Sequence, residues 1–516
     1  MYSMIRIKYV FFSFLIISLG SFSAVANDIK VSNVFLTNQN SVSNYWIVKF
    51  DISWNNSWNV NGLSNNHDAA WVFVKYRVGR GDWQSAYINN TGNSITGTST
   101  PSLTIENGLL NPSSIFDPTI NPVLGVFLYR TNSGLSSGSN SANSVQLKWN
   151  YGSQATTVND DDVIDIRVFA IEMVHIPTGE FAVGSGAVTD NEFALTTIST
   201  ATATQTPTGI GSLGGNSGGY PTGQSAPASS NFPNGYSAFY AMKYEISQQQ
   251  YADFLNTLTR TQQAIRFSST TVGNFFYSSA GRTIPSNRNG LRLISDPGGS
   301  LPRYFGCDLN NNSTPDESTD GGAIACNFLS WADISAYLDW ACLRPITELE
   351  YEKIARGDKA TVLNEFAWGS TNIIQSTGLS ADGSSTETAS PNNANCNNGS
   401  LSGPVRVGSF SSGAYTREKS GASYFGCMEL SGNVEELVIC IANSTGRSFT
   451  GDLGNGVLTN NGFADVTSWP ISNGLGVGTR GGSWNSNTTL LQTSNRANAF
   501  SYTNARTPLI GGRGGR

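Results

Sequence analysis

The 516-residue sequence has 30 Lys and Arg against 36 Asp and Glu, a formal net charge of −6, and only 13% charged residues. No segment is rich in Lys and Arg, so the positive patch that holds a nucleic-acid backbone is missing, and we expect no nucleic-acid partner. The 55 glycines and an aromatic fraction of 11% are typical of an ordered, loop-rich, β-rich exported protein, and the length predicts two or three domains.

The first 26 residues have the pattern of a secretory signal peptide. Arg6 and Lys8 form a basic start, residues 10–19 are apolar, and Ala24-Val25-Ala26 supplies small residues for cleavage. Because the apolar stretch is too short for a bilayer core of about 30 Å, we expect cleavage rather than anchoring. No later segment is long and apolar enough to cross a membrane. The sequence therefore predicts a secreted or periplasmic protein with no membrane span.

Residues 27–170 consist of short alternating apolar runs separated by turn residues. Examples are residues 45–52, 71–76, 124–129 and 163–169. A period of two at this spacing predicts an antiparallel β-sandwich domain. We interpret the acidic triplet at residues 160–162 as a solvated turn before the last strand rather than a cation site.

The second predicted domain covers residues 171–516. Within it, residues 186–235 are rich in Ser, Thr, Gly and Pro without periodicity, and we interpret them as a low-complexity surface loop. Apolar residues at helical spacing predict three helices, which are capped by Ser247, Ser330 and Thr347.

Residues 308–320 form an oxygen-rich loop that suits calcium. A hard cation takes six to eight oxygen ligands on a tightly turning loop. The candidate ligands are Asp308, Asn310, Asn312, Asp316 and Asp320. The alternative interpretation is a polar turn between Cys307 and Cys326, and both interpretations stay open.

All six cysteines lie in the second half of the chain: Cys307, Cys326, Cys342, Cys396, Cys427 and Cys440. In an exported protein an even number favours disulfides, whose pairing the sequence does not give. No pair has the short spacing of zinc ligands. Cys342 lies in a predicted helix and is also explained as a small buried residue.

Six sequence blocks occur in the order found in the formylglycine-generating, sulfatase-modifying enzyme family, which the second domain resembles. They are residues 329–333, 343–357, 366–369, 407–410, 432–437 and 480–484. The resemblance implies an α+β fold, an irregular C-type-lectin-like domain preceded here by the all-β sandwich. It also implies calcium as a structural cofactor.

The resemblance places calcium ligands and the active site on particular residues. The implied calcium ligands are the side chains of Glu429 and Glu436 and the backbone carbonyls of Gly432 and Val434. Ser483 and Ser486 stand at family active-site positions, and Arg480, Trp484 and Asn485 line a possible cleft. The two copper-binding cysteines of the family are replaced by Ser486 and Leu491.

These replacements leave copper without thiolate ligands, and copper chemistry is not expected. The non-haem iron site of a related branch needs three histidines, but the chain has only His67 and His175, which we expect to be distant and ordinary. The late arginines, Arg480, Arg496, Arg506, Arg513 and Arg516, either line an anion-binding cleft or form buried ion pairs, and we favour buried pairs.

The sequence therefore predicts an exported, calcium-stabilised, non-catalytic member of this family that acts as a binding or envelope-structural module. Its partner at the cell envelope is a protein or a glycan. Two alternatives remain. One is an oxidoreductase or other metal-dependent modifying enzyme of the formylglycine-generating type with unrecognised ligands, and in the other the sandwich is the functional part.

Overall fold

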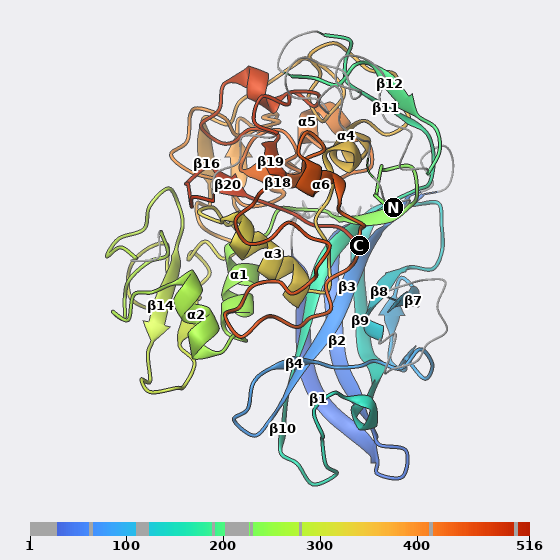
Figure 1. Ribbon diagram of the computed structural model, residues 1–516, viewed down its shortest axis with the longest axis vertical. Helices are drawn as coiled ribbons and strands as arrows, with labels where there is room; N and C mark the ends of the chain where they lie inside the picture. Colours follow the sequence, from blue (N-terminus) through green and yellow to red (C-terminus); the bar gives the residue numbers. More distant parts are fainter. Residues whose placement is uncertain are drawn as a thin grey trace, which may run out of the picture.

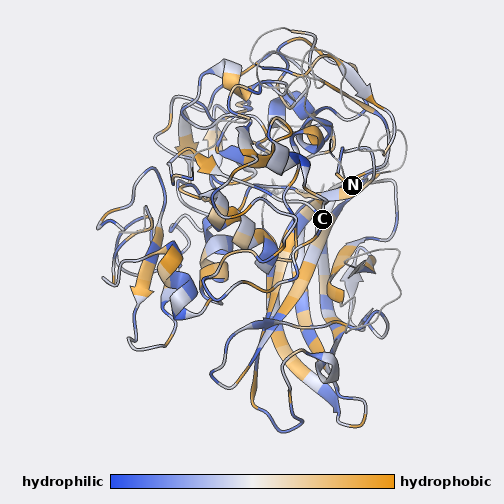
Figure 2. Ribbon diagram, viewed as in Figure 1, coloured by the Kyte–Doolittle hydropathy of each residue, from blue (hydrophilic) through white to orange (hydrophobic). Residues whose placement is uncertain are grey.

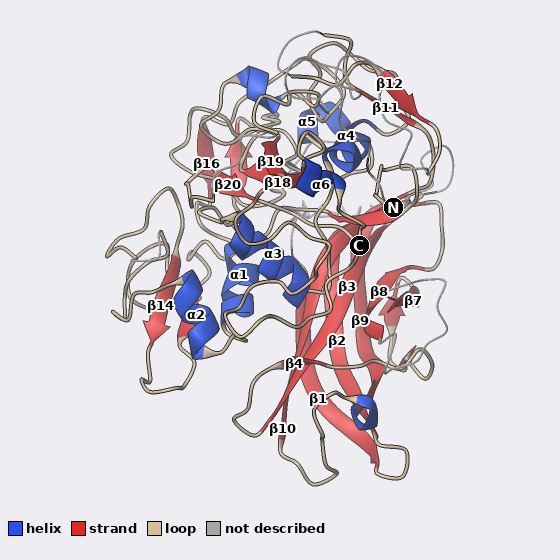
Figure 3. Cartoon of the chain, viewed as in Figure 1, coloured by secondary structure: helices blue, strands red, loops and turns tan. Residues whose placement is uncertain are grey.

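The computed structural model describes residues 28–60, 66–109, 123–187, 191–201, 227, 231–277, 281–411, 416–499 and 504–516. The predicted signal peptide and much of the predicted loop at residues 186–235 lie outside the described residues. The fold is mostly sheet with few helices, at 32% strand and 12% helix, and its N-terminal part is β-rich (Figure 3).

Long strands in the N-terminal part form two antiparallel sheets (Figure 1). The first sheet contains β1 (Lys30–Asn40), β2 (Tyr45–Asn59), β5 (Ser94–Ile95), β6 (Ser99–Thr100) and β9 (Leu135–Asn150), which is followed by η1 (Tyr151–Ser153). The second contains β3 (Asp68–Val78), β4 (Gln84–Ser85), β7 (Leu103–Leu109), β8 (Val123–Arg130), β10 (Ile164–Ile176) and β13 (Phe239–Met242). Apolar side chains from both sheets form one buried cluster, which Figure 2 shows as orange bands along the strands.

Strand β3 is buried on both faces because its alternate residues belong to different cores. Ala70, Val72 and Val74 join the cluster between the two sheets. Trp71 and Phe73 join a second cluster, which contains α1 and α3 of the C-terminal part. Since successive strand residues point to opposite faces, the near-continuous apolar run of β3 is explained by two cores.

Strand β10 runs through the predicted boundary between residues 170 and 171. Its residues 164–174 pair with β3, and residues 173–176 pair with β13. One continuous strand therefore connects the N-terminal sheet with the region that follows.

The C-terminal part is built from short elements joined by long loops (Figure 3). Its strands are β11 (Phe181–Val183), β12 (Thr196–Ile198), β14 (Leu291–Ser295), β15 (Tyr304–Cys307), β16 (Gly378–Ser380), β17 (Thr388–Ser390), β18 (Glu435–Ile439), β19 (Val477–Arg480) and β20 (Ile510–Gly511). The central strand of the last three is β18, which pairs antiparallel with β19 and parallel with β20.

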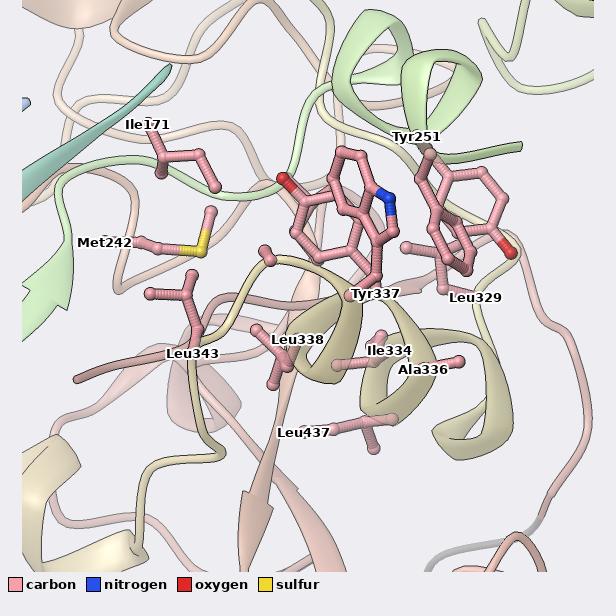
Figure 4. Close-up of a cluster of buried hydrophobic side chains, with 14 of the residues drawn as sticks. Ile171, Met242, Tyr251, Leu329, Ile334, Ala336, Tyr337, Leu338, Leu343 and Leu437 are labelled. Atoms are coloured by element: carbon pink, nitrogen blue, oxygen red, sulfur yellow. The ribbon is translucent and has the colours of Figure 1, made fainter. Parts of the chain in front are cut away.

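The helices are α1 (Gln248–Leu255), α2 (Arg260–Arg266), α3 (Trp331–Trp340), α4 (Glu348–Arg356), α5 (Arg417–Ser420) and α6 (Ser444–Arg447), with short 3₁₀ turns η2 (Ser409–Ser411) and η3 (Thr488–Leu491). The three predicted N-caps are confirmed, because Ser247, Ser330 and Thr347 each form a capping box at the start of α1, α3 and α4. Helices α1 and α3 bury the apolar cluster of Figure 4, where Tyr251 and Tyr337 face the same core.

The prediction of disulfides is wrong for this structure, in which all six cysteines are free and buried. Cys342 packs in the main cluster, while Cys427 and Cys396 lie in two other clusters. Burial raises the pKa of the Cys396, Cys427 and Cys440 thiols to about 12. These thiols fill core positions as small apolar groups, and buried ion pairs hold the loops instead.

No helix in the described part of the chain is long and apolar enough to cross a membrane.

Candidate functional site

A glycine pair directly after β19 brings two distant segments together. Gly481 and Gly482 have φ angles of +85° and +64°, where a side chain is strained. A Cβ on Gly481 would lie 2.5 Å from the carbonyl oxygen of Leu430. The Gly432 N–H donates to the Gly481 carbonyl at 2.8 Å, so the turn lies against residues 429–434.

Ser483 and Ser486 form hydrogen bonds with each other inside this turn. Their Oγ atoms lie 3.0 Å apart, and the Ser483 N–H donates to Ser486 Oγ at 2.9 Å. Ser483 is fully buried and Ser486 is almost so. A serine nucleophile needs a basic side chain within hydrogen-bond reach. Among the described residues neither hydroxyl has one, so the pair fits a turn-stabilising role.

Leu491 lies in the protein core with Phe366, Trp368 and Cys396. The Cys396 thiol is therefore beside a position that the family resemblance assigns to a cysteine. Its Sγ donates to Asn398 Oδ1 at 3.0 Å, and burial raises its pKa to about 12. Metal binding and nucleophilic attack require a thiolate, whereas this environment keeps the thiol protonated.

The three residues assigned to a possible cleft have different environments. Trp484 is 8% exposed, and its Nε1–H donates to the Pro508 carbonyl at 2.8 Å. Arg480 is 2% exposed and points into the core. Asn485 is exposed. Asn485 is therefore the member of this set that a partner reaches without rearrangement.

Arg480 belongs to a buried ion-pair cluster centred on α4. Its guanidinium lies 3.3 Å from Glu348 Oε2 and 2.8 Å from Glu352 Oε1. Arg496 donates to both oxygens of Glu348, at 2.7 and 2.8 Å. Arg513 likewise pairs with Glu436, and Arg506 pairs with Asp333. The interpretation of the late arginines as buried pairs is confirmed for Arg480, Arg496 and Arg513, whereas Arg506 pairs with a buried carboxylate but is itself only partly buried.

Three buried glutamates meet next to the glycine turn: Glu245, Glu429 and Glu436. Glu245 accepts the Val434 N–H at 3.1 Å and Asn433 Nδ2 at 2.6 Å. Glu429 Oε1 accepts the Gly408 N–H at 2.8 Å, and Glu436 Oε1 pairs with Arg513 at 2.6 Å. The second carboxylate oxygens of Glu429 and Glu436 are buried without a hydrogen-bond partner in the described chain.

These carboxylates raise one another's proton affinity. Burial raises the pKa of Glu245 well above its usual range, and the charges of Glu429 and Glu436 raise it further. Burial also raises the pKa of Glu429 to about 7. Such shifts arise where negative charges are desolvated close together. The Arg513 guanidinium already lowers the pKa of all three carboxyls, and a bound cation would lower it further.

The donors at this place are oxygen groups, the kind of ligand that calcium takes. Two orphaned carboxylate oxygens are available, and Gly432 and Val434 lie between Glu429 and Glu436, in the segment directly before β18. Calcium accepts carboxylate and carbonyl oxygens in a flexible geometry. Among the described residues, no three Asp, Glu, His or Cys side chains already stand in a chelating arrangement. Ligation there therefore depends on backbone oxygens and on some side-chain adjustment.

Most oxygen groups of the loop at residues 308–320 have protein partners, but Asp320 Oδ1 is buried without a hydrogen-bond partner in the described chain. Asp308 forms an ion pair with Arg292, and its Oδ1 accepts the Asn312 N–H at 3.1 Å. Asp316 Oδ1 accepts the Cys307 N–H at 2.9 Å. Hydrogen bonds within the loop also use the other candidate side chains, which are those of Asn310, Asn312 and Asp320. These contacts fit a polar turn, the orphaned Asp320 oxygen fits a cation site, and a cation bound by Asp308 would have to displace Arg292.

The two histidines are not distant, and that expectation is corrected. The rings of His67 and His175 stack with centroids 4.9 Å apart, because the strand β10 passes directly beside residue 67. His67 Nε2 lies 2.9 Å from the Tyr240 hydroxyl. Burial and the neighbouring His175 lower the pKa of His67 to about 4. The pair is an aromatic contact at the junction of β3, β10 and β13.

Two residues of this region were missed in the sequence analysis. Glu245 and Lys243 are the two charged residues in the otherwise apolar and aromatic run at residues 239–246, and charges in such a run were a usable signal. Cys396 gave no such signal, because its contact with Leu491 joins segments far apart in the sequence.

A comparison with protein families shows which family the second region is similar to. The family model of the sulfatase-modifying factor enzyme 1-like domain matches residues 167–511. No curated protein matches the chain.

Proposed function

Because the chain belongs to the sulfatase-modifying factor family, we propose that it is an exported, calcium-stabilised binding or envelope-structural module of that family without its oxidative chemistry. The proposal includes a C-type-lectin-like fold for the second region and a protein or glycan partner at the cell envelope. It also includes secretion or periplasmic export through the N-terminal signal sequence.

The observation that carries the non-catalytic part is the environment of Ser486 and Leu491. Ser486 bonds to Ser483 in a closed turn, and Leu491 packs in an apolar cluster. Burial raises the pKa of the neighbouring Cys396 thiol to about 12, which favours the thiol over the thiolate. Soft thiolate ligands are what a copper site of this kind requires, and this environment offers none among its described residues.

Calcium is the cofactor that the glutamate cluster favours. Glu429 and Glu436 would hold it with the carbonyls of Gly432 and Val434, and Glu245 lies beside them. Bound calcium would neutralise the carboxylates and fix the glycine turn against β18. It would supply structural stability rather than reaction chemistry.

Thermal unfolding with added calcium or with a chelator tests this proposal. Calcium at about 100 times its dissociation constant stabilises a folded protein by about 2.7 kcal/mol. We expect the chelator to lower the unfolding midpoint and calcium to restore it. If the protein is first stripped of metal and added calcium then leaves the unfolding midpoint unchanged, calcium is not part of the structure and this part of the proposal fails.

Two near-isosteric variants locate the ion. In Glu429→Gln the Gly408 hydrogen bond can persist, so we expect the calcium-dependent shift to disappear while the calcium-free midpoint stays equal or rises. Asp316→Asn is the matched control in the loop at residues 308–320 and should keep the shift. If Asp316→Asn loses the calcium-dependent shift and Glu429→Gln keeps it, the calcium site lies in the loop at residues 308–320 instead.

A further inference from the structure

A cavity of about 690 Å³ opens between the N-terminal strands and the helices of the C-terminal part. Residues of β1 and β10 line one side, and residues of α1 and α3 line the other. Figure 1 shows these two helices beside the long strands. The volume lies in the range of about 300–1,000 Å³ that is typical of small-molecule sites. Its lining residues belong neither to the glutamate cluster nor to the Ser483 turn.

Three packed aromatic rings contribute to the cavity wall: Phe73, Phe169 and Trp340. The centroid of Trp340 lies 5.1 Å from that of Phe73 and 4.9 Å from that of Phe169. Phe73 and Trp340 are buried, whereas Phe169 is half-buried. The three rings therefore pack together behind the cavity wall, and Phe169 on β10 is the one that exposes part of its apolar ring.

Helix α1 adds a polar stripe. Gln249, Asp253 and Asn256 are separated by four and three residues, so they lie on one helix face. Gln249 Nε2 donates to Asp253 Oδ1 at 3.1 Å and orients that carboxylate. The Asn256 side chain forms two hydrogen bonds of 2.8 Å with the backbone of Phe305: its Nδ2 donates to the carbonyl, and its Oδ1 accepts from the N–H. Asp253 and Gln249 are thus the side chains with capacity for a ligand.

Two further polar groups in the wall lack partners. The Tyr337 hydroxyl and the Trp340 indole N–H are buried without a hydrogen bond to the described chain. Figure 4 shows Tyr337 on α3, within the buried cluster. Leaving such a group unsatisfied costs roughly 1–3 kcal/mol. A ligand or water that supplies hydroxyl groups would recover part of that cost after a small adjustment of the wall.

The charges around the cavity nearly balance. Asp28, Asp253 and Glu317 are acidic, and Lys30 and Arg167 are basic. Asp28 and Lys30 pair with each other at 2.9 Å. Arg167 stacks over Trp83 at 4.6 Å. A cavity of this kind selects strongly for neither an anion nor a cation.

We infer that the cavity binds a neutral carbohydrate, of the size of a di- or trisaccharide. Sugar hydroxyls both donate and accept, as Asp253, Gln249, Tyr337 and Trp340 require. The C–H faces of a sugar ring match an apolar aromatic surface. This inference rests on the proposed binding function and names its ligand class and its site.

Isothermal titration with neutral di- and trisaccharides tests it. The panel is built from glucose, galactose, mannose, xylose and N-acetylglucosamine, and tetramethylammonium and glutamate serve as charged probes. At least one saccharide should bind the full chain. Asp253→Asn and Gln249→Ala should each weaken its binding about tenfold or more, as expected when a hydrogen bond to a charged group is lost or misdirected. Asp358→Asn, at an exposed ion pair, is the control and should leave binding unchanged.

The variants must first keep the wild-type unfolding midpoint. The inference is overturned if no saccharide of the panel binds, if binding is the same in both cavity variants, or if only a charged probe binds. Measuring the calcium-dependent midpoint on the same samples separates the two proposals. A retained calcium shift without saccharide binding defeats the carbohydrate site alone, and a missing shift defeats the calcium scaffold.

Discussion

Glu348 connects three segments that are far apart in the sequence. Its carboxylate accepts from Arg480, from Arg496 and from the Ile441 N–H at 2.9 Å. All of this charge is buried. The residue therefore holds α4, β18 and the segment after β19 in one arrangement, on which the glycine turn depends.

We predict that Glu348→Gln lowers the free energy of unfolding by about 3–5 kcal/mol, because it leaves two buried guanidinium groups short of a counter-charge. Urea unfolding followed by circular dichroism measures this. Asp358→Asn removes an exposed ion pair with Lys359 and should change the same quantity by less than about 1 kcal/mol. Equal effects of the two changes would contradict the assignment of Glu348 as a structural centre.

His67 gives the protein an acid-sensitive contact. Its pKa is lowered from 6.5 to about 4 in the folded state, first by burial and then by His175. Between these two values the unfolded chain binds more protons than the folded chain, so this contribution to stability is present above pH 6.5 and is lost as the pH falls toward 4.

We therefore predict that the unfolding midpoint falls less steeply between pH 6.5 and 4 in His67→Gln than in the wild type. Glutamine can still reach the Tyr240 hydroxyl but does not titrate in this range. The measurement is thermal unfolding in a series of buffers. Identical pH profiles would show that His67 titrates normally.

At the scale of elements, helix starts were predicted correctly from neighbouring residues, whereas contacts between distant segments were not predicted. The caps at Ser247, Ser330 and Thr347 follow from residues three positions apart, and each is confirmed. The two-sided burial of β3 and the stacking of His67 on His175 depend on which strands pair, and the sequence does not state this. The cysteines were misjudged because burial, rather than compartment, decides their environment in this structure.

The candidate site divides in the same way. The glycine turn and Glu436 lie in contiguous blocks that resemble a family, and Glu429 stands three residues before one of these blocks. Glu245 and Cys396 enter from other segments and became visible only in three dimensions. Residues that act through contacts across hundreds of positions carry no spacing pattern for sequence analysis to detect.

Strands β10 and β9 each carry a residue that probes one of the two cores. Met173→Ala opens a space in the cluster that contains α1 and α3, and Leu147→Ala in β9 does so between the two N-terminal sheets. Each should cost about 2–5 kcal/mol, as large-to-small changes in cores do. Because β10 and β3 belong to both regions, we expect each change to lower the same unfolding transition. Two separately shifted transitions in calorimetry would contradict this coupling.

At the scale of the whole molecule, the continuous strand and the shared cluster connect the β-rich N-terminal part with the family-like region. The family match covers residues 167–511, so it begins within β10 itself. The inferred carbohydrate cavity lies between these parts, and the glutamate cluster lies within the second. The architecture thus joins the two parts through one strand and one shared core, with the cavity between them.

Metal analysis of the purified full chain tests the central claim most directly. The protein is purified without chelator, then exposed to calcium, copper(I) and iron(II) in separate samples and desalted before elemental measurement. We predict that calcium is retained at about one ion per chain and that Glu429→Gln loses it, whereas copper and iron are not retained in stoichiometric amounts. Stoichiometric copper or iron on the wild-type chain would contradict the account and return the protein to the catalytic members of its family.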